Sequence, residues 1–187
     1  MCKRSALVSL GLLVALTLTG GHAWPAEPLF VNGGFEQGLV KPWGTGMYSE
    51  DRPLWWNSGD CDSTVELDER GPIEGIAALH IVNLTPRTAH VYGTVAQRVR
   101  IEPNRPYRIT LWARGLDLAS AGAVTLIVDE AWKVRPIALP GGSFAWTKLS
   151  GTFSLPADYA DIRILSEDAG EAWIDDVRIE PLNTLLQ

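Results

Sequence analysis

The side chains in this sequence most able to bind a ligand are its tryptophans, of which there are eight in 187 residues. Trp55 and Trp56 are adjacent in a stretch rich in Pro, Gly and polar residues, which predicts a loop that cannot easily bury both rings. Flat aromatic rings stack on the apolar faces of sugars, and planar polar side chains bond sugar hydroxyls. The aromatic platforms that we expect to remain accessible are Trp55, Trp56, Tyr92, Trp112 and Trp132. The hydrogen-bonding side chains expected beside them are Arg98, Arg114, Asp129 and Glu130.

For any single member of this set, the alternative is ordinary packing or a solvated charge. Three other tryptophans, Trp43, Trp146 and Trp173, lie at strand starts or at positions that read as inward, and we assign them to packing.

A second candidate site centres on one carboxylate near the C-terminus. Val177 and Ile179 are apolar positions of one predicted strand, so Asp175, at the same parity, should point inward with them. Asp176 should point outward. A buried carboxylate is costly unless it is paired or bound to a metal ion. The pattern therefore predicts either a metal ligand or an aspartate held by backbone N–H groups or an arginine.

The sequence contains no strong catalytic motif. The spacing of His80 and His90 is not that of a zinc site, and Cys61 lacks the context of a catalytic nucleophile. A glycosidase needs two carboxylates about 5–10 Å apart. With 22 acidic residues such a pair arises by chance, and Asp129 or Glu130 facing residues 50–51 is one example.

The alternatives to binding come from two other classes. A small polysaccharide lyase or hydrolase could use Tyr92, His90 and Arg114 in a cleft. A structural or adhesion protein of the envelope would use the same fold to bind a protein. We expect non-catalytic binding rather than either of these.

The N-terminus has the three parts of a secretory signal: a basic start, an apolar run and a small-residue end. We expect a signal peptide over residues 1–23, with cleavage possibly at 26, and a secreted or periplasmic bacterial protein. Loss of Lys3 and Arg4 leaves 14 basic residues against 22 acidic ones. This balance argues against nucleic acid as a partner. The later sequence has no stretch apolar enough to span a membrane.

Short alternating runs separated by Pro and Gly residues fill the rest of the chain. Regular short strands of this kind predict an all-β fold, an antiparallel β-sandwich or barrel. We expect one domain over residues 27–181 and a flexible tail over 182–187. The expected strands are 76–82, 91–101, 107–114, 124–129, 146–155, 161–165 and 172–180.

Four motifs in this order resemble the carbohydrate-binding modules of families 4, 9 and 22, the cellulase-C type, which are jelly rolls like galactose-binding domains. The motifs are Leu29–Glu36 (LFVNGGFE) with Trp43, Gly75–Ile81 (GIAALHI), Gln97–Val99 leading to Tyr107–Ala113 (YRITLWA), and Ala172–Ile179 (AWIDDVRI). The resemblance implies a β-sandwich jelly roll that binds a polysaccharide or oligosaccharide. Modules of this kind usually accompany catalytic domains, so a separate glycan-active enzyme is an expected partner.

The same resemblance implies a structural calcium ion, Ca²⁺. The ligands that it maps onto this chain are Asp175, Glu36, the Gly34 carbonyl, and Gly75 or a neighbouring carbonyl. Calcium prefers six to eight such oxygen ligands.

Overall fold

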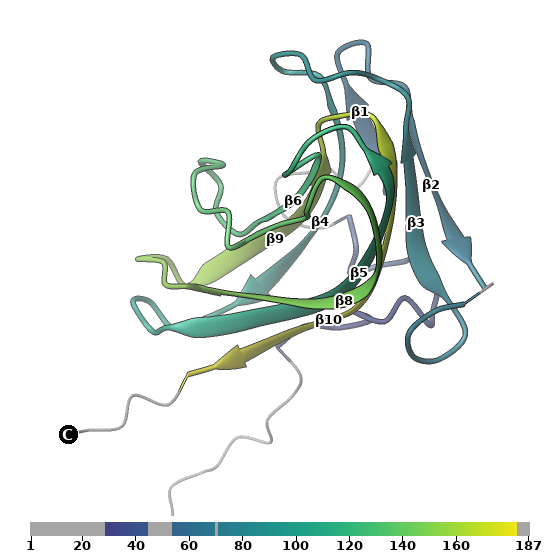
Figure 1. Cartoon of the computed structure of the whole chain (residues 1–187). Coiled ribbons are helices and arrows are strands. Elements are labelled where there is room, and N and C mark those ends of the chain that lie inside the picture. Colours follow the sequence, from purple (N-terminus) through teal and green to yellow (C-terminus); the bar gives the residue numbers. More distant parts are fainter. Residues whose placement is uncertain (1–28, 45–53, 70, 183–187) are drawn as a thin grey trace, which may run out of the picture.

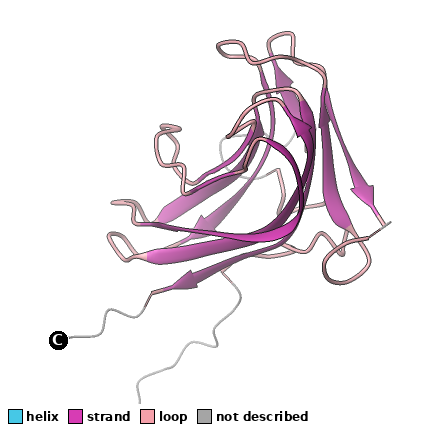
Figure 2. Ribbon diagram, viewed as in Figure 1, coloured by secondary structure: helices cyan, strands magenta, loops and turns pink. Residues whose placement is uncertain are grey.

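The computed structural model describes residues 29–44, 54–69 and 71–182, and these residues form two packed antiparallel sheets (Figures 1 and 2). Sheet A has the strand order β1-β4-β9-β6-β7, and sheet B has the order β2-β3-β10-β5-β8. The strands are β1 (Trp56–Ser58), β2 (Ser63–Asp68), β3 (Ala78–Asn83), β4 (Tyr92–Arg100), β5 (Tyr107–Leu118), β6 (Val124–Ile127), β7 (Ile137–Ala138), β8 (Gly142–Phe153), β9 (Tyr159–Ser166) and β10 (Gly170–Pro181).

The all-β antiparallel sandwich predicted from the sequence is confirmed. The described ranges contain no helix, and therefore none that is long and apolar enough to cross a membrane. The predicted signal peptide and most of the tail lie outside the described residues. Figure 1 shows β5, β8 and β10 bending along their length, so that sheet B curves around sheet A.

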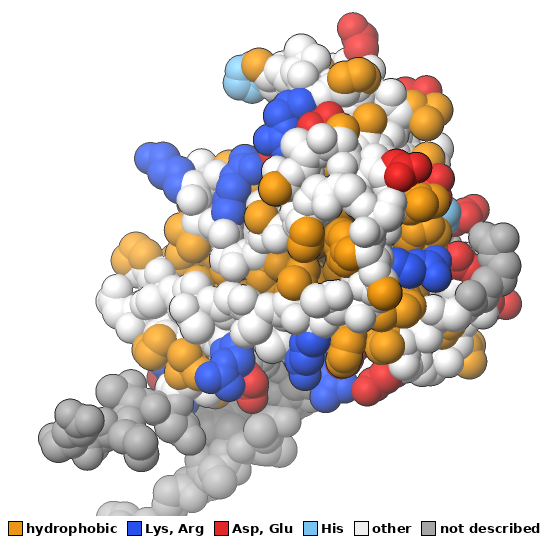
Figure 3. Space-filling view, viewed as in Figure 1, with side chains coloured by type: hydrophobic (Ala, Val, Ile, Leu, Met, Phe, Trp, Pro, Cys, Tyr) orange, Lys and Arg blue, Asp and Glu red, His pale blue; other side chains and the backbone are white. Residues whose placement is uncertain are grey.

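The core lies between the sheets, and β5 shows this most plainly because its buried positions alternate with more exposed ones. On β5, Tyr107, Ile109, Leu111 and Ala113 are almost fully buried, as the alternation predicted. Figure 3 shows further hydrophobic side chains gathered across the middle of the viewed face.

An aromatic cluster closes one part of the core. Trp43 is fully buried, stacks on Phe35 at 5.1 Å and meets the edge of Phe30 at 5.3 Å between ring centroids. Its indole N–H donates to the backbone oxygen of Asn32. The N-terminal segment is thus tied to the core by one ring, and the expectation that Trp43 packs inward is confirmed.

Three strands were missed by the sequence analysis. Strand β2 has only two apolar residues, Val65 and Leu67, β7 has two residues, and β1 lies in the stretch interpreted as a loop. Because β1 is a strand, Trp55 and Trp56 point to opposite sides of sheet A. A Cβ on Gly93 would lie only 2.7 Å from Trp55 Cζ2, which places the Trp55 ring on the inner side of β4.

The parity argument for Asp175 was wrong, although the side chain is fully buried. The pairing of β10 with β5 shifts between Asp175 and Arg178, and Asp176 has a left-handed φ of 51°. This β-bulge breaks the alternation, so Asp175 shares the outer face of sheet B with Trp173, while Val177 points inward. Asp175 is buried because the backbone of residues 73–74 covers it.

The assignment of Trp173 to packing is confirmed, since it is buried and stacks on His80, whereas Trp146 is only half-buried. Both rings lie on the outer face of sheet B and not between the two sheets. Trp173 is 8% exposed and Trp146 is half-buried.

We expect Trp43→Ala to lower the free energy of unfolding by about 3–5 kcal/mol, because it removes a large buried ring and leaves a cavity. Leu84→Ala, at a side chain 67% exposed, should change it by less than about 0.5 kcal/mol. Urea denaturation of both variants checks this, and equal losses would contradict the packing described for Trp43.

Candidate functional site

A row of aromatic rings lies on the outer face of sheet A. Trp56 on β1 meets Tyr92 on β4 edge to face at 6.1 Å, and Tyr92 lies 5.0 Å from Trp132 between ring centroids. All three side chains are half-buried, so each keeps part of its ring open to solvent. The row joins strands β1 and β4 to the loop that follows β6.

Trp132 is held from below by a buried arginine. The Arg163 guanidinium on β9 lies 4.3 Å from the centre of the Trp132 ring and is fully buried. It pairs with Asp161, also fully buried, at 3.6 Å and donates to the Asp129 backbone oxygen at 3.3 Å. A cation over an indole face is attractive, most strongly when desolvated. The ring is therefore fixed in place before any ligand arrives.

The loop that carries Trp132 is closed by Asp129, a residue near its start. Asp129 Oδ1 accepts the backbone N–H groups of Lys133 and Val134 at 2.9 and 2.8 Å. Trp132 has a left-handed φ of 64°, which this tight turn imposes. The Asp129 carboxylate thus shapes the loop through its Oδ1 atom.

Charged side chains border the row on the β4–β9 side. Arg98 bonds Asp161 through Nε at 2.7 Å and Glu130 through Nη2 at 3.2 Å, and its guanidinium covers the Tyr159 ring at 4.0 Å. The bond from Asp161 raises the pKa of Arg98 above its ordinary value. Tyr159 donates its hydroxyl to Glu130, and this bond raises the pKa of the phenol. Each charge here already has a partner of opposite sign.

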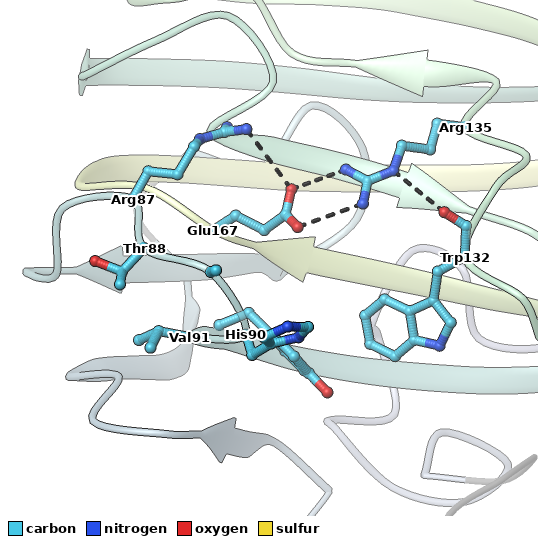
Figure 4. Close-up of a pocket in the computed structure, with 9 residues that line it drawn as sticks. Arg87, Thr88, His90, Val91, Trp132, Arg135 and Glu167 are labelled. Carbon is cyan, nitrogen blue, oxygen red and sulfur yellow. Dashed lines mark hydrogen bonds and ion pairs between the residues drawn. The ribbon is translucent and has the colours of Figure 1, made fainter.

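A cavity of about 580 Å³ extends the row beyond Tyr92 and Trp132 (Figure 4). Glu167 lies between two guanidiniums, accepting from Arg135 at 2.8 Å and lying 3.9 Å from Arg87. Figure 4 shows this trio on one side of the cavity and the Trp132 indole with His90 on the other. The cavity thus combines an aromatic wall with paired donors and acceptors, the usual construction of a small-molecule site.

The structure brings five of the predicted ligand residues to this face and leaves others elsewhere. Those that lie together are Trp56, Tyr92, Trp132, Arg98 and Glu130. Trp55 does not join them, because its indole packs inward and donates to Ser63 Oγ at 3.1 Å. Trp112 and Arg114 do not join them either, since both lie on the outer face of sheet B.

Several residues of this face were missed from the sequence. They are Asp161, Arg163, Tyr159, Arg87, Arg135 and Glu167. The run Tyr159–Arg163 alternates, and its polar members share one side of β9, which was the available signal. Arg87 and Glu167 meet only through the fold, so no local pattern could have paired them.

The catalytic alternative is not assembled. Tyr92 and His90 border the cavity on sheet A, whereas Arg114 lies on sheet B, so the three do not share a cleft. Residues 50–51, the partners suggested for Asp129 and Glu130, lie outside the described residues. Cys61 is a half-buried free thiol whose Sγ lies 3.9 Å from Asn83 Oδ1.

The residues predicted to bind calcium do converge. Asp175 Oδ1 and Glu36 Oε1 lie 3.7 and 3.9 Å from the position that a Cβ on Gly34 would occupy. A Cβ on Gly75 would lie 2.0 Å from Glu36 Oε1, so only glycine lets the carboxylate in. Two carboxylates thus approach each other across two glycines, which a cation between them would stabilise.

The side chains of the candidate calcium site do not supply enough ligands for the ion, and the Asp175 carboxylate already accepts backbone hydrogen bonds. Its Oδ2 accepts the N–H groups of Ile73 and Glu74 at 3.0 and 3.2 Å, and its Oδ1 accepts that of Asp176 at 2.6 Å. Burial outweighs these bonds and raises the pKa of Asp175. No group of three or more His, Cys, Asp or Glu side chains suited to a metal occurs in the described part of the chain. Calcium here would need backbone oxygens and water as further ligands.

Comparisons with known proteins agree with this fold. No protein-family model matches the chain. It is 27% identical over 154 residues to the tRNA nuclease WapA of Bacillus subtilis (strain 168), a match that covers 72% of this chain but 7% of WapA. The chain therefore spans a small part of that curated relative, far from the whole nuclease.

Two solved structures carry the comparison further. The module TmCBM61, in complex with β-1,4-galactotriose, superposes with a TM-score of 0.56 at 16% identity, covering 84% of this chain and 100% of that one. A family 4 carbohydrate-binding module superposes with a TM-score of 0.53 at 15% identity, covering 81% and 98%. The resemblance to these jelly rolls is thus confirmed at the level of the fold.

Glu130→Gln should lower the pKa of Tyr159, because the bond that favours the neutral phenol loses its charged acceptor. Tyrosinate formation would then begin at a lower pH in an ultraviolet titration. Glu102→Gln, which removes a carboxylate from a different ion pair, is the control. Identical titrations for all three proteins would contradict the contact.

Proposed function

We propose that this chain binds a neutral or charged polysaccharide or oligosaccharide on the outer face of sheet A and performs no chemistry on it. The single observation that carries the proposal is the row Trp56–Tyr92–Trp132 beside paired charged side chains. Sugar rings need stacking surfaces and planar hydrogen-bonding groups at the same place, and this face supplies both.

Preorganisation supports this proposal. Arg163 and the turn closed by Asp129 hold Trp132 before binding, so ordering this ring costs little when a ligand arrives. Arg98 with Glu130, and Arg135 with Glu167, each offer donors and acceptors side by side. Such pairs suit the vicinal hydroxyls of a sugar.

The similarity to modules that bind sugars supports the same function. TmCBM61 was solved with β-1,4-galactotriose bound, and it shares this fold over its whole length. Non-catalytic binding also fits the separation of Arg114 from Tyr92 and His90 on opposite sheets.

We further propose a structural calcium ion held by Asp175, Glu36 and the backbone at Gly34 and Gly75. When bound, the ion would supply positive charge between two converging carboxylates. Its role would be to tie the N-terminal segment to β10, since Val177 N–H already donates to the Gly33 oxygen there at 3.0 Å. The site lies on sheet B, away from the aromatic row.

The signal-like N-terminus supports export to the outside or the periplasm of a bacterium. A module that only binds a glycan can hold an enzyme's substrate close to that enzyme when both recognise the same glycan. We therefore propose a separate glycan-active enzyme as a functional partner.

Trp132→Ala and Trp56→Ala should each weaken retention on a glycan-containing native gel about 30-fold or more, since an aromatic anchor contributes about 2 kcal/mol or more. Trp112→Ala is the matched control, because it removes a half-buried tryptophan from the opposite sheet. A panel of plant and bacterial polysaccharides identifies the glycan first. Equal retention by the Trp132 and Trp112 variants would refute the assignment of the face.

Calcium should raise the melting temperature of metal-free protein, and a chelator should reverse the shift. Without metal, the raised pKa of Asp175 means that the folded state holds the proton more tightly than the unfolded state. Stability therefore falls as pH rises from the ordinary aspartate pKa through the raised one. Because calcium binds the ionised carboxylates, its stabilising effect should be larger near about pH 7 than near about pH 4.

Asp175→Asn should abolish the calcium response, while Asp60→Asn, at an exposed position, should leave it intact. No shift with calcium at either pH in the unmodified protein would remove the proposed ion.

A further inference from the structure

One arginine on sheet B differs from the others in its partners. Seven described arginines have a carboxylate within 4 Å: Arg87, Arg98, Arg105, Arg108, Arg135, Arg163 and Arg178. Arg100 has none among the described residues, but it is exposed to water. Arg114 is half-buried, its Nε is buried without a hydrogen-bond partner, and its guanidinium lies over two aromatic rings.

Those rings hold the Arg114 guanidinium in place. Its Cζ lies 3.8 Å from the centre of the Trp173 ring and 5.7 Å from that of Trp146. A half-buried guanidinium packed against indoles loses hydration without gaining an anion. The charge is therefore preformed and uncompensated by any side chain that the structure describes.

Trp173 is itself firmly anchored. Its indole N–H donates to Asp68 Oδ2 at 2.9 Å, and its other face stacks on His80 at 4.2 Å with an angle of 3°. His80 is fixed in turn by Glu66 and Glu171, one on each ring nitrogen at 3.1 and 3.0 Å. The stack His80–Trp173–Arg114 crosses β3, β10 and β5, so Arg114 cannot leave without uncovering Trp173.

A hollow of about 470 Å³ opens beside Arg114 on this face. Its walls include Leu116, which is 43% exposed, Phe144 and the edge of Trp173. The Ser143 hydroxyl also lines it and donates to Asp117. A second hollow of about 230 Å³ shares Leu116 and continues toward Val82 and Leu84.

We propose that this hollow is a second binding site, for a sugar residue that carries a carboxylate, a uronic acid within a glycan chain. The forked donors of a guanidinium match a carboxylate, and a charge-assisted pair would satisfy the orphaned Arg114. The apolar walls suit the C–H face of the ring. The adjoining hollow gives room for the next residue of the chain. The acidic groups nearby, Asp117 and Glu171, are already engaged by Ser143 and His80.

This site is independent of the aromatic row on sheet A, where every arginine that borders the row has a carboxylate partner. The two proposals can therefore fail separately.

Titration calorimetry with oligogalacturonate, and with the same oligomer as its methyl ester, tests the second site. We expect the unmodified protein to bind the acid and to bind the uncharged ester at least about tenfold more weakly. Arg114→Gln should weaken binding of the acid by a similar factor. Arg100→Gln, which removes an exposed arginine of the same charge, should not.

Three results would overturn the second site: no binding of the acid, equal binding of acid and ester, or equal affinities for the Arg114 and Arg100 variants. The ester comparison uses the unmodified protein, so it decides the matter even if Arg114→Gln does not fold. Arg114→Gln should keep its retention on any neutral glycan bound at sheet A, and loss of that retention alone would count against the face on sheet A.

Discussion

The buried pair formed by Arg163 and Asp161 is the interaction on which the proposed binding face depends. Both side chains are fully buried on β9, where an unpaired charge would be strongly destabilising. Their pairing lets one guanidinium support the Trp132 ring and one carboxylate hold Arg98. Replacing such a pair with apolar residues often costs no stability. The pair therefore matters here because it positions Trp132 and Arg98.

Each sheet has an arginine stacked on a tryptophan, but the two pairs have different roles. On sheet A, Arg163 packs against the Trp132 ring, and the same ring lines the cavity. On sheet B, Arg114 lies over Trp173, whose second face is already occupied by His80. On sheet A the indole of Trp132 is the surface that a ligand would contact. On sheet B the indole of Trp173 supports Arg114, and the guanidinium faces the hollow.

Strand alternation predicted the sandwich and most strands, most plainly on β5, where buried positions recur with a period of two over Tyr107–Gly115. It failed where the period is interrupted. The bulge after Asp175 reverses parity, and nothing in the residues Asp175–Val177 announces it beyond the carboxylates themselves. The short strand β1 divides Trp55 from Trp56, although both rings looked equally accessible in sequence.

The candidate site was predictable only in part, for a related reason. Trp56, Tyr92 and Trp132 stood out as aromatic residues expected to remain accessible, whereas Arg163 reads as an ordinary polar position of a strand. Its role arises from the loop after β6 folding over β9, a contact between residues about thirty positions apart. Long-range packing of this kind leaves no local pattern in the chain.

The most direct test of the central claim is a nuclear magnetic resonance titration that follows the assigned indole N–H signals while neutral oligosaccharides are added. The proposed binding face predicts that the signals of Trp56 and Trp132 shift together and saturate, while that of the buried Trp43 stays in place. Shifts confined to tryptophans of sheet B, or no shift with any glycan of a broad panel, would contradict it.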